Sequence, residues 1–248
     1  MEGRVAALFR HPVKSVGREK LEAVELEAGC ALPMDRVWAV THGRSRFDFA
    51  ARIWAPCGNF LRVASSPRLA AVEARLAGAR LRLTHPEAEP WEGDPEADGQ
   101  ALADWAGALA GERQPGPYRL ARAAQALTDA AEPLITLGNL ASLRALSERM
   151  GRPLDPARFR CNVWLEGLDP WEERGWREGD ALRLGAARLR VDEPVQRCRA
   201  TEANPETGAR DAAVLEALRE ATGAAEFTIY AGVTVGGRVA LGDALSTP

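Results

Sequence analysis

A cysteine between two arginines is the group in this sequence best suited to chemistry. Cys198 lies between Arg197 and Arg199. Nearby positive charge favours the thiolate form of a cysteine, and the thiolate is the form that acts as a nucleophile or binds a metal. The alternative is a cysteine that packs as a small hydrophobic residue. The local sequence marks Cys198 as a candidate and leaves both roles open.

The segment before Cys198 is predicted to be a β-hairpin. Residues 181–184 and 188–191 form two short alternating runs, with Gly185 at the turn between them. Pro194 is expected to end the second strand, because proline cannot donate a hydrogen bond to a β-ladder. Cys198 would then lie in the loop that follows the hairpin.

The segment after Cys198 is predicted to be a turn followed by a helix. The sequence NPETG at 204–208 has proline and glycine at positions that favour a turn. Asp211 is expected to cap a helix over 212–222, and Gly223 is expected to end it. The thiol would therefore be held between two ordered segments.

Several polar residues near the N-terminus could bind an anion. Lys14 and Ser15 together offer a point charge and a hydroxyl, a pairing that suits phosphate. Arg36 could bind a phosphate or a carboxylate through two parallel hydrogen bonds. Each has an ordinary alternative, because Lys14 and Ser15 could form a solvated loop and Arg36 could pair with Asp35.

A second group of polar residues lies in the C-terminal half. Asn139 is expected to cap a helix over 140–150, and Ser142 lies in its first turn, where free amide groups can bind anions. Capping alone is the simpler role for Asn139. Arg160 and Asn162 precede an apolar strand, where they could bind a polar ligand or hold a loop in place.

Composition excludes several classes of protein. The chain has 248 residues, a net charge of −3 and 46% hydrophobic residues, so it has ample core material and no global field that would attract nucleic acid. Its four cysteines are scattered and contain no C-x-x-C pair, which argues against zinc ribbons and iron–sulfur clusters. No apolar run is long enough for a membrane span or a signal peptide. We therefore expect a cytoplasmic protein that binds neither nucleic acid nor membrane.

The predicted elements favour a mainly β fold with inserted helices, an α+β arrangement. Helices are predicted after Ser66-Pro67, with Leu69, Val72 and Leu76 on one face, and over 100–110. The acidic, proline-rich segment 85–98 is expected to be a surface loop. Other strands are predicted at 5–9, 21–26, 37–40, 80–84, 118–121, 133–137, 163–165, 227–230, 233–235 and 238–241. So many short strands favour a barrel over a doubly wound parallel sheet.

A polar segment rich in proline and glycine, 111–117, suggests a boundary between two units. It predicts an N-terminal β domain over 1–113 and a C-terminal domain over 114–248.

The order of these motifs resembles the MOSC family, named after the C-terminal domain of molybdenum cofactor sulfurase. The same two-part arrangement occurs in the mitochondrial amidoxime-reducing component and its bacterial relatives. The resemblance covers nearly the whole chain and implies a MOSC-type β-barrel domain after a smaller N-terminal β domain. The motifs are HPVKS at 11–15, MDRVWAV at 34–40, NLASL at 139–143, RFRCN at 158–162, GLDPWEE and GWREGDALRLGAARLRV between 167 and 191, QRCRATEANPETGARD at 196–211, and GGRVALGD at 236–243.

The resemblance implies a molybdenum cofactor, Mo-molybdopterin, held between the two domains. Cys198 would be the thiolate ligand to molybdenum, since a soft sulfur ligand suits a metal already held by sulfur, and Arg197 would support the ligand or the metal's oxo groups. The residues that would bind the cofactor are Lys14, Ser15, Arg36, Asn139, Ser142, Arg160 and Asn162. Cys161 stands where relatives often have a proline or a small residue, and packing is its expected role.

The leading hypothesis is an oxidoreductase that reduces N-hydroxylated or N-oxide substrates. No cysteine set for a cluster exists, so electrons would come from a separate protein of ferredoxin, flavodoxin or cytochrome type. The alternative is a protein that carries the cofactor, or a persulfide on Cys198, without its own turnover. A third possibility is a small-molecule binding domain that has lost its metal.

Overall fold

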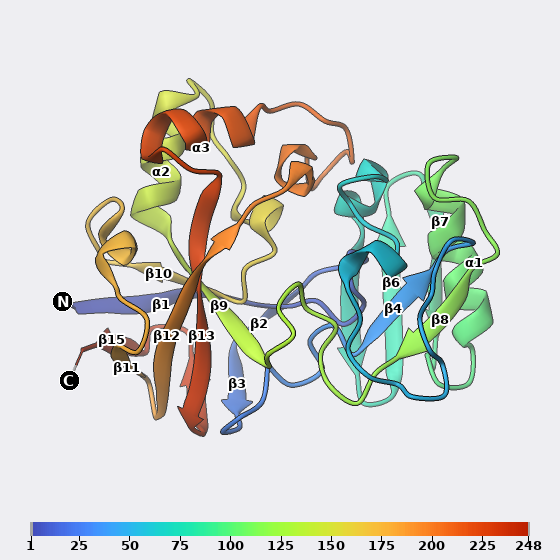
Figure 1. The fold of residues 1–248 in the computed structure, drawn as a ribbon, viewed down its shortest axis with the longest axis horizontal. Coiled ribbons are helices and arrows are strands. Elements are labelled where there is room, and N and C mark those ends of the chain that lie inside the picture. Colours follow the sequence, from blue (N-terminus) through green and yellow to red (C-terminus); the bar gives the residue numbers. More distant parts are fainter. Residues whose placement is uncertain (1, 248) are drawn as a thin grey trace.

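The fold is built around a closed barrel in the larger of two lobes (Figure 1). The computed structural model describes residues 2–247. Seven strands close the barrel because β1 pairs with both β10 and β15. In spatial order they are β1 (Glu2–Arg10), β10 (Val163–Glu166), β9 (Leu134–Asn139), β13 (Glu226–Val235), β12 (Ala187–Gln196), β11 (Ala181–Leu184) and β15 (Ala244–Ser246). The predicted mainly β class and the barrel are confirmed.

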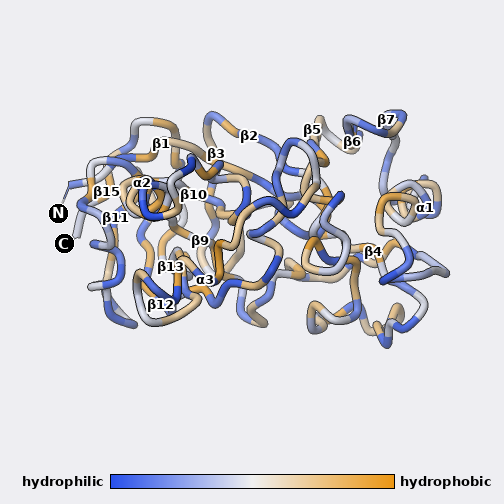
Figure 2. The backbone as a smooth tube through the Cα atoms, turned by 90° about the horizontal axis from the view of Figure 1, so that it is seen from above, coloured by the Kyte–Doolittle hydropathy of each residue, from blue (hydrophilic) through white to orange (hydrophobic). Residues whose placement is uncertain are grey.

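Apolar side chains fill the barrel, and two helices cover one side of it. Strands such as β12 alternate buried and exposed residues, as a strand with one face on a core requires. Helices α2 (Leu140–Arg149) and α3 (Val214–Thr222) pack on a cluster that includes Phe159, Trp164 and Phe227. The first and last strands lie side by side, at the end of the barrel farthest from the second lobe (Figure 2).

The second lobe has its own core, built on small sheets and one helix. Its elements are β4 (Trp38–Thr41), β5 (Glu73–Ala77), β6 (Arg80–His85), β7 (Ala88–Gly93), α1 (Gly99–Ala110) and β8 (Arg119–Arg122). Leu102, Ala103 and Ala106 of α1 are fully buried against this sheet layer. Among residues 2–247, no helix has the length and apolar character needed to cross a membrane.

Strand pairing crosses the sequence boundary predicted at 113/114. Besides β1, the short strands β2 (Glu19–Leu21) and β3 (Ala23–Leu26) belong to the larger lobe, where β3 pairs with β14 (Gly237–Ala240). In the opposite direction, β8 pairs with β4 in the smaller lobe. The chain therefore passes between the lobes more than once, and its connecting loops run through the space between them.

Three local predictions are wrong, each for a physical reason. After Ser66 only a 3₁₀ turn forms, Pro67–Ala71, because the next residues alternate and pair with β6 as a hairpin. The expected loop 85–98 contains β7, whose Trp91 packs into the core. Pro194 does not end β12, because the register shifts around it, and proline is tolerated at such bulges.

Candidate functional site

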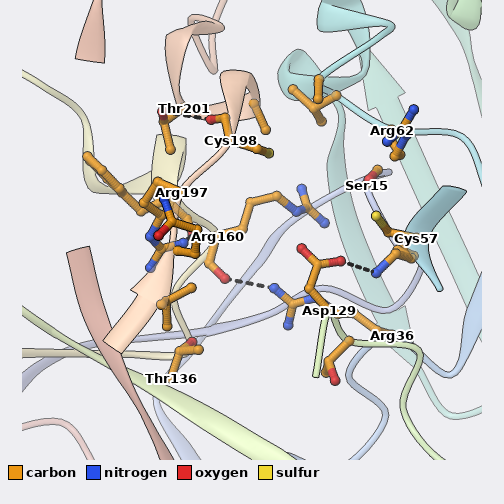
Figure 3. A pocket seen from close by; sticks show the side chains of 18 of the residues that line it. Ser15, Arg36, Cys57, Arg62, Asp129, Thr136, Arg160, Arg197, Cys198 and Thr201 are labelled. Atoms are coloured by element: carbon orange, nitrogen blue, oxygen red, sulfur yellow. Dashed lines mark hydrogen bonds and ion pairs between the residues drawn. The ribbon is translucent and has the colours of Figure 1, made fainter. Parts of the chain in front are cut away.

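A cavity of about 290 Å³ lies between the two lobes and collects most of the predicted site residues. Cys198 lies on its wall, just beyond the end of β12, and its side chain is exposed. Figure 3 shows Cys198, Arg197 and Thr201 on one side, and Ser15, Cys57 and Arg62 on the other. Its lining residues include Lys14, Ser15, Arg36, Cys57, Arg62, Asp129, Thr136, Arg158, Arg160, Asn162, Arg197, Cys198, Thr201 and Tyr230.

The backbone of Cys198 is held in place while its thiol is left open. The Cys198 carbonyl accepts hydrogen bonds from the amide and the hydroxyl of Thr201, at 3.2 and 3.1 Å. Among residues 2–247, no hydrogen bond involves its Sγ atom, whereas Cys161 Sγ contacts two carbonyl oxygens. The thiol of Cys198 is therefore available to a ligand in the cavity.

Arg197 holds the chain in place between the end of β12 and Cys198. Its guanidinium donates to the carbonyls of Phe227 (2.6 Å) and Phe159 (2.9 Å) and to the hydroxyl of Thr228. Burial lowers the pKa of Arg197. Because three of its five N–H groups are bound by the protein, Arg197 connects β12, β13 and the 3₁₀ turn Pro156–Phe159 beside the thiol.

Charged residues hold the loop after Cys198. Asp211 accepts hydrogen bonds from Arg158 (2.7 Å), Arg152 (2.9 Å) and Asn204 (2.8 Å). The predicted helix cap at Asp211 is therefore wrong, since α3 begins only at Val214 and the carboxylate is used by the loop instead.

The predicted turn at 204–208 forms, and it packs against the second lobe. The Asn204 side chain accepts from the amide of Glu206 at 2.8 Å. Gly208 has φ +70°, and a Cβ there would lie 2.5 Å from Arg68 Cα. Only glycine lets this turn approach the other lobe so closely.

The predicted anion-binding residues from the N-terminal segment meet at the cavity. The Lys14 ammonium, 5% exposed, donates to the Leu127 carbonyl at 2.7 Å and to the Asp129 carboxylate at 2.6 Å. Burial lowers the pKa of Lys14, and Asp129 opposes this effect. Arg36 pairs with the buried Asp35 and also lines the cavity, so the pairing and the binding role are compatible.

Arg160 is the least compensated of these cations. Its guanidinium donates to the Gly17 carbonyl at 3.0 Å, and its own carbonyl accepts from Arg36 at 2.8 Å. Burial and the neighbouring Arg36 lower the pKa of Arg160 to about 9. An anion placed here would remove this repulsion.

Three residues that line the cavity have strained backbone conformations. Ser15, Arg36 and Arg160 have φ values of 63°, 52° and 48°, a region that residues other than glycine rarely adopt. Such conformations cost energy and cluster at functional sites, where the surrounding structure enforces them.

Two predicted cofactor ligands, Asn139 and Ser142, do not line the cavity. Both side chains donate to the buried Glu173 carboxylate, at 2.8 Å each. Asn139 also caps α2 by accepting from the Ala141 amide. Their polar groups are consumed by this buried network, so the structure gives them a role in folding.

Asn162 lines the cavity, but its side chain is also occupied. It is 1% exposed, accepts from the amide and hydroxyl of Thr136, and donates to the Phe9 carbonyl. Cys161 is buried in the core beneath α2 and α3, where burial raises the pKa of its thiol to about 11. It does not line the cavity, in agreement with the expected packing role.

Sequence reasoning missed several lining residues, among them Cys57, Arg62 and Asp129. They lie in irregular segments with no periodic signal. Of the three, only Cys57 has a side chain whose chemistry could have drawn attention in the sequence. All three line the cavity because of how the two lobes meet.

Comparison with known proteins places the chain in a family. The model of the MOSC domain matches residues 126–246, and that of the MOSC N-terminal beta barrel domain matches residues 2–113. The chain belongs to the MOSC family. Within this MOSC protein, the cavity lies where residues of both matched regions meet.

Individual relatives are more distant. Mitochondrial amidoxime-reducing component 1 of Xenopus laevis is 35% identical over 78 residues, which are 32% of this MOSC chain and only 22% of that protein. The YUAD protein of Bacillus subtilis is 15% identical with a TM-score of 0.47, over 99% of this chain and 94% of that one. YiiM of Geobacillus stearothermophilus is 23% identical with a TM-score of 0.36, over 46% and 53% of the two chains. TM-scores of this size do not support a detailed structural comparison, so no argument is based on these two structures.

The residues of the cavity in this MOSC protein suit a ligand that combines an anion with a metal that accepts a sulfur ligand. Among residues 2–247, no three His, Cys, Asp or Glu side chains converge as a metal site. A metal bound to Cys198 would therefore need its other ligands from a non-protein group. A dithiolene cofactor with a phosphate supplies both those ligands and a counterion for the cationic wall.

We predict that the buried His11 makes stability sensitive to acid. Burial, Arg160 and Arg36 lower the pKa of His11 to about 3, so the unfolded chain takes up a proton that the folded protein excludes. The free energy of unfolding should therefore fall as pH drops from about 6.5 towards 3, by up to about 1.4 kcal/mol per pH unit. Urea unfolding at pH 7, 6 and 5 measures this slope.

The matched variant is His11→Asn, which keeps a donor near Asp35 but cannot titrate. The pKa of His85 is also lowered by burial and acts in the same direction, so the difference in slope between the two proteins isolates His11. Equal slopes would contradict the prediction.

We also predict that Asn139 and Arg160 differ in what they support. Asn139→Ala should lower the free energy of unfolding by about 1–3 kcal/mol, because it removes one of the two side-chain donors to the buried Glu173 and the cap of α2. Arg160→Met should leave the cofactor-free protein as stable as wild type or more so, since it removes a repelled cation. It should nevertheless lower pterin retention. Unfolding curves and pterin assays on both variants measure these effects, and the reverse pattern would contradict the assignment.

Proposed function

We propose that this protein is a molybdenum-cofactor oxidoreductase that reduces N-hydroxylated or N-oxide substrates. The observation that carries the proposal is the open thiol of Cys198 in a cavity with a cationic wall. Family membership supports the cofactor, and the name of the amidoxime-reducing relative supports the reaction class.

The chain supplies positions for each part of the cofactor. Lys14, Ser15, Arg36 and Arg160 would hold the phosphate and pterin, and Cys198 would bind molybdenum through sulfur. Arg197 acts as a positioning residue, because its contacts with β13 fix the strand end beside the thiol.

When bound, the cofactor would supply the oxygen-accepting redox chemistry. For an N-hydroxylated amine, the N–O bond breaks, an N–H bond forms, and the oxygen leaves as water. The balance needs two electrons and two protons. We propose a separate electron-donor protein of ferredoxin, flavodoxin or cytochrome type, because Cys30, Cys57 and Cys161 are free and dispersed and build no second redox centre.

A second candidate is a carrier of cofactor or sulfur. The exposed Sγ of Cys198 has no protein hydrogen bond among residues 2–247, which also suits a transferable persulfide. Mass spectrometry would then find a sulfur adduct on Cys198. The same protein would contain no molybdenum and would show no reductase activity.

We predict that Cys198→Ser loses molybdenum. The protein is produced in a host that makes the cofactor, and molybdenum and pterin are quantified, together with benzamidoxime reduction driven by a chemical electron donor. A hydroxyl is a poor replacement for the soft thiolate, so metal content and activity should fall to background. Cys30→Ser, an exposed cysteine outside the cavity, is the control and should match wild type. Equal metal in Cys198→Ser, or no metal in wild type, would refute the proposed function.

A further inference from the structure

The cavity carries more positive charge than its carboxylates balance. Six lysine or arginine side chains and one carboxylate line it. Ion pairs compensate three of the cations, Lys14 with Asp129, Arg36 with Asp35, and Arg158 with Asp211. Across the described chain, no carboxylate lies within ion-pair distance of the other three, Arg62, Arg160 and Arg197.

Two of these three already have an explanation. Arg197 is bound by two carbonyls and a hydroxyl, and it fastens β12. Arg160 lies beside Arg36 among the residues assigned to the cofactor. Arg62 remains without a role.

The guanidinium of Arg62 is poorly satisfied by the protein. Its Nε atom is buried and has no acceptor among residues 2–247. Within the same residues its guanidinium makes one hydrogen bond, from Nη2 to the Ser65 hydroxyl at 3.4 Å, which is long for such a bond. The guanidinium therefore keeps hydrogen-bonding capacity that the described protein does not use, and Arg62 lines the cavity, where a ligand could supply the acceptor.

The backbone of Arg62, in contrast, is rigidly held. Its amide donates to the side chain of buried Gln114 at 2.9 Å. Its carbonyl accepts from the amides of Ser65 (3.0 Å) and Ser66 (2.8 Å). The protein therefore fixes the base of this side chain and leaves its charged end open.

Arg62 also lies at a fixed place relative to the thiol. Arg210 donates to the carbonyl of Ala64 on the Arg62 wall and to the carbonyl of Arg199 beside Cys198. The two walls are thus joined by one side chain, and Arg62 and Cys198 lie on opposite sides of the cavity in Figure 3.

We propose that Arg62 selects the substrate by binding a carboxylate on it, so that the substrates are N-hydroxylated compounds that also carry an acidic group. The planar guanidinium matches a carboxylate through two parallel hydrogen bonds. This inference rests on the proposed function for the reaction, but the recognition of the carboxylate can be measured without turnover.

The test compares a neutral ligand with its acidic counterpart. Benzamidoxime and 4-carboxybenzamidoxime are titrated by calorimetry into cofactor-loaded and cofactor-free protein. Wild type should bind the acid about tenfold tighter or more, the effect expected of a charged hydrogen-bonded pair. Arg62→Met should remove this preference with little change for benzamidoxime, and Arg62→Lys should keep part of it. Arg68→Met, which removes a surface arginine paired with Glu87, should behave as wild type.

The outcomes separate this inference from the proposed function. Equal binding of the two ligands by wild type, or an unchanged preference in Arg62→Met, overturns it. Loss of pterin from Arg62→Met also overturns it, because Arg62 would then hold the cofactor. If Arg62→Met does not fold, Arg62→Lys decides, and a full wild-type preference there overturns the bidentate contact. If wild type contains no molybdenum, the reductase proposal is refuted. The preference of the cofactor-free protein for 4-carboxybenzamidoxime over benzamidoxime still decides the role of Arg62.

Discussion

Uncompensated positive charge between the two lobes is the constraint on which the rest of this structure depends. Like charges in a partly buried space repel, and Arg160 shows the cost because its pKa falls to about 9. The fold limits that cost with carboxylates placed behind the cations. Asp35, 1% exposed, is the clearest case, because burial alone would raise its pKa but Arg36 and His11 lower it below the ordinary range.

The connectivity of the chain explains how this charge is gathered. β1 lies in the barrel, and the loop that follows it carries Lys14 and Ser15 into the cavity before the chain enters the smaller lobe. Later in the chain, the barrel strand β9 supplies Thr136, and the segment that follows barrel strand β12 supplies Cys198. The cavity therefore exists only when both lobes are folded together, which makes its geometry a property of the whole chain.

Sequence reasoning predicted together several residues that the structure brings to one cavity, but it missed other lining residues. Cys198, Lys14, Arg36 and Arg160 were predicted as a group because motif order supplied tertiary information that no single segment contains. Asn139 was misassigned as a ligand because a helix cap and an anion site have the same local pattern, and only the buried Glu173 distinguishes them.

The errors in the fold have a similar cause. Leu69, Val72 and Leu76 fit one face of a helix, yet they also suit a 3₁₀ turn followed by a strand, and pairing with β6 decides between these structures. The helix over 100–110 was predicted well because its apolar stripe has no comparable strand alternative. Long-range pairing is invisible to local periodicity, so a segment with two local solutions, such as 69–76, cannot be assigned from its own sequence.

The arginines of the cavity fall into two physical classes, and the division separates structure from function. Arg197 and Arg158 each donate several N–H groups to the protein, to carbonyls and to the Thr228 hydroxyl or the Asp211 carboxylate, and their loss would release the loop around Cys198. Arg160 and Arg62 have few hydrogen-bond partners in the protein, so their loss would change the stability of the cofactor-free protein little. A side chain that the fold holds at its base and leaves unsatisfied at its tip contributes little to stability. Its charged end is free for a ligand, which is why the poorly bonded arginines are the better guide to what this protein binds.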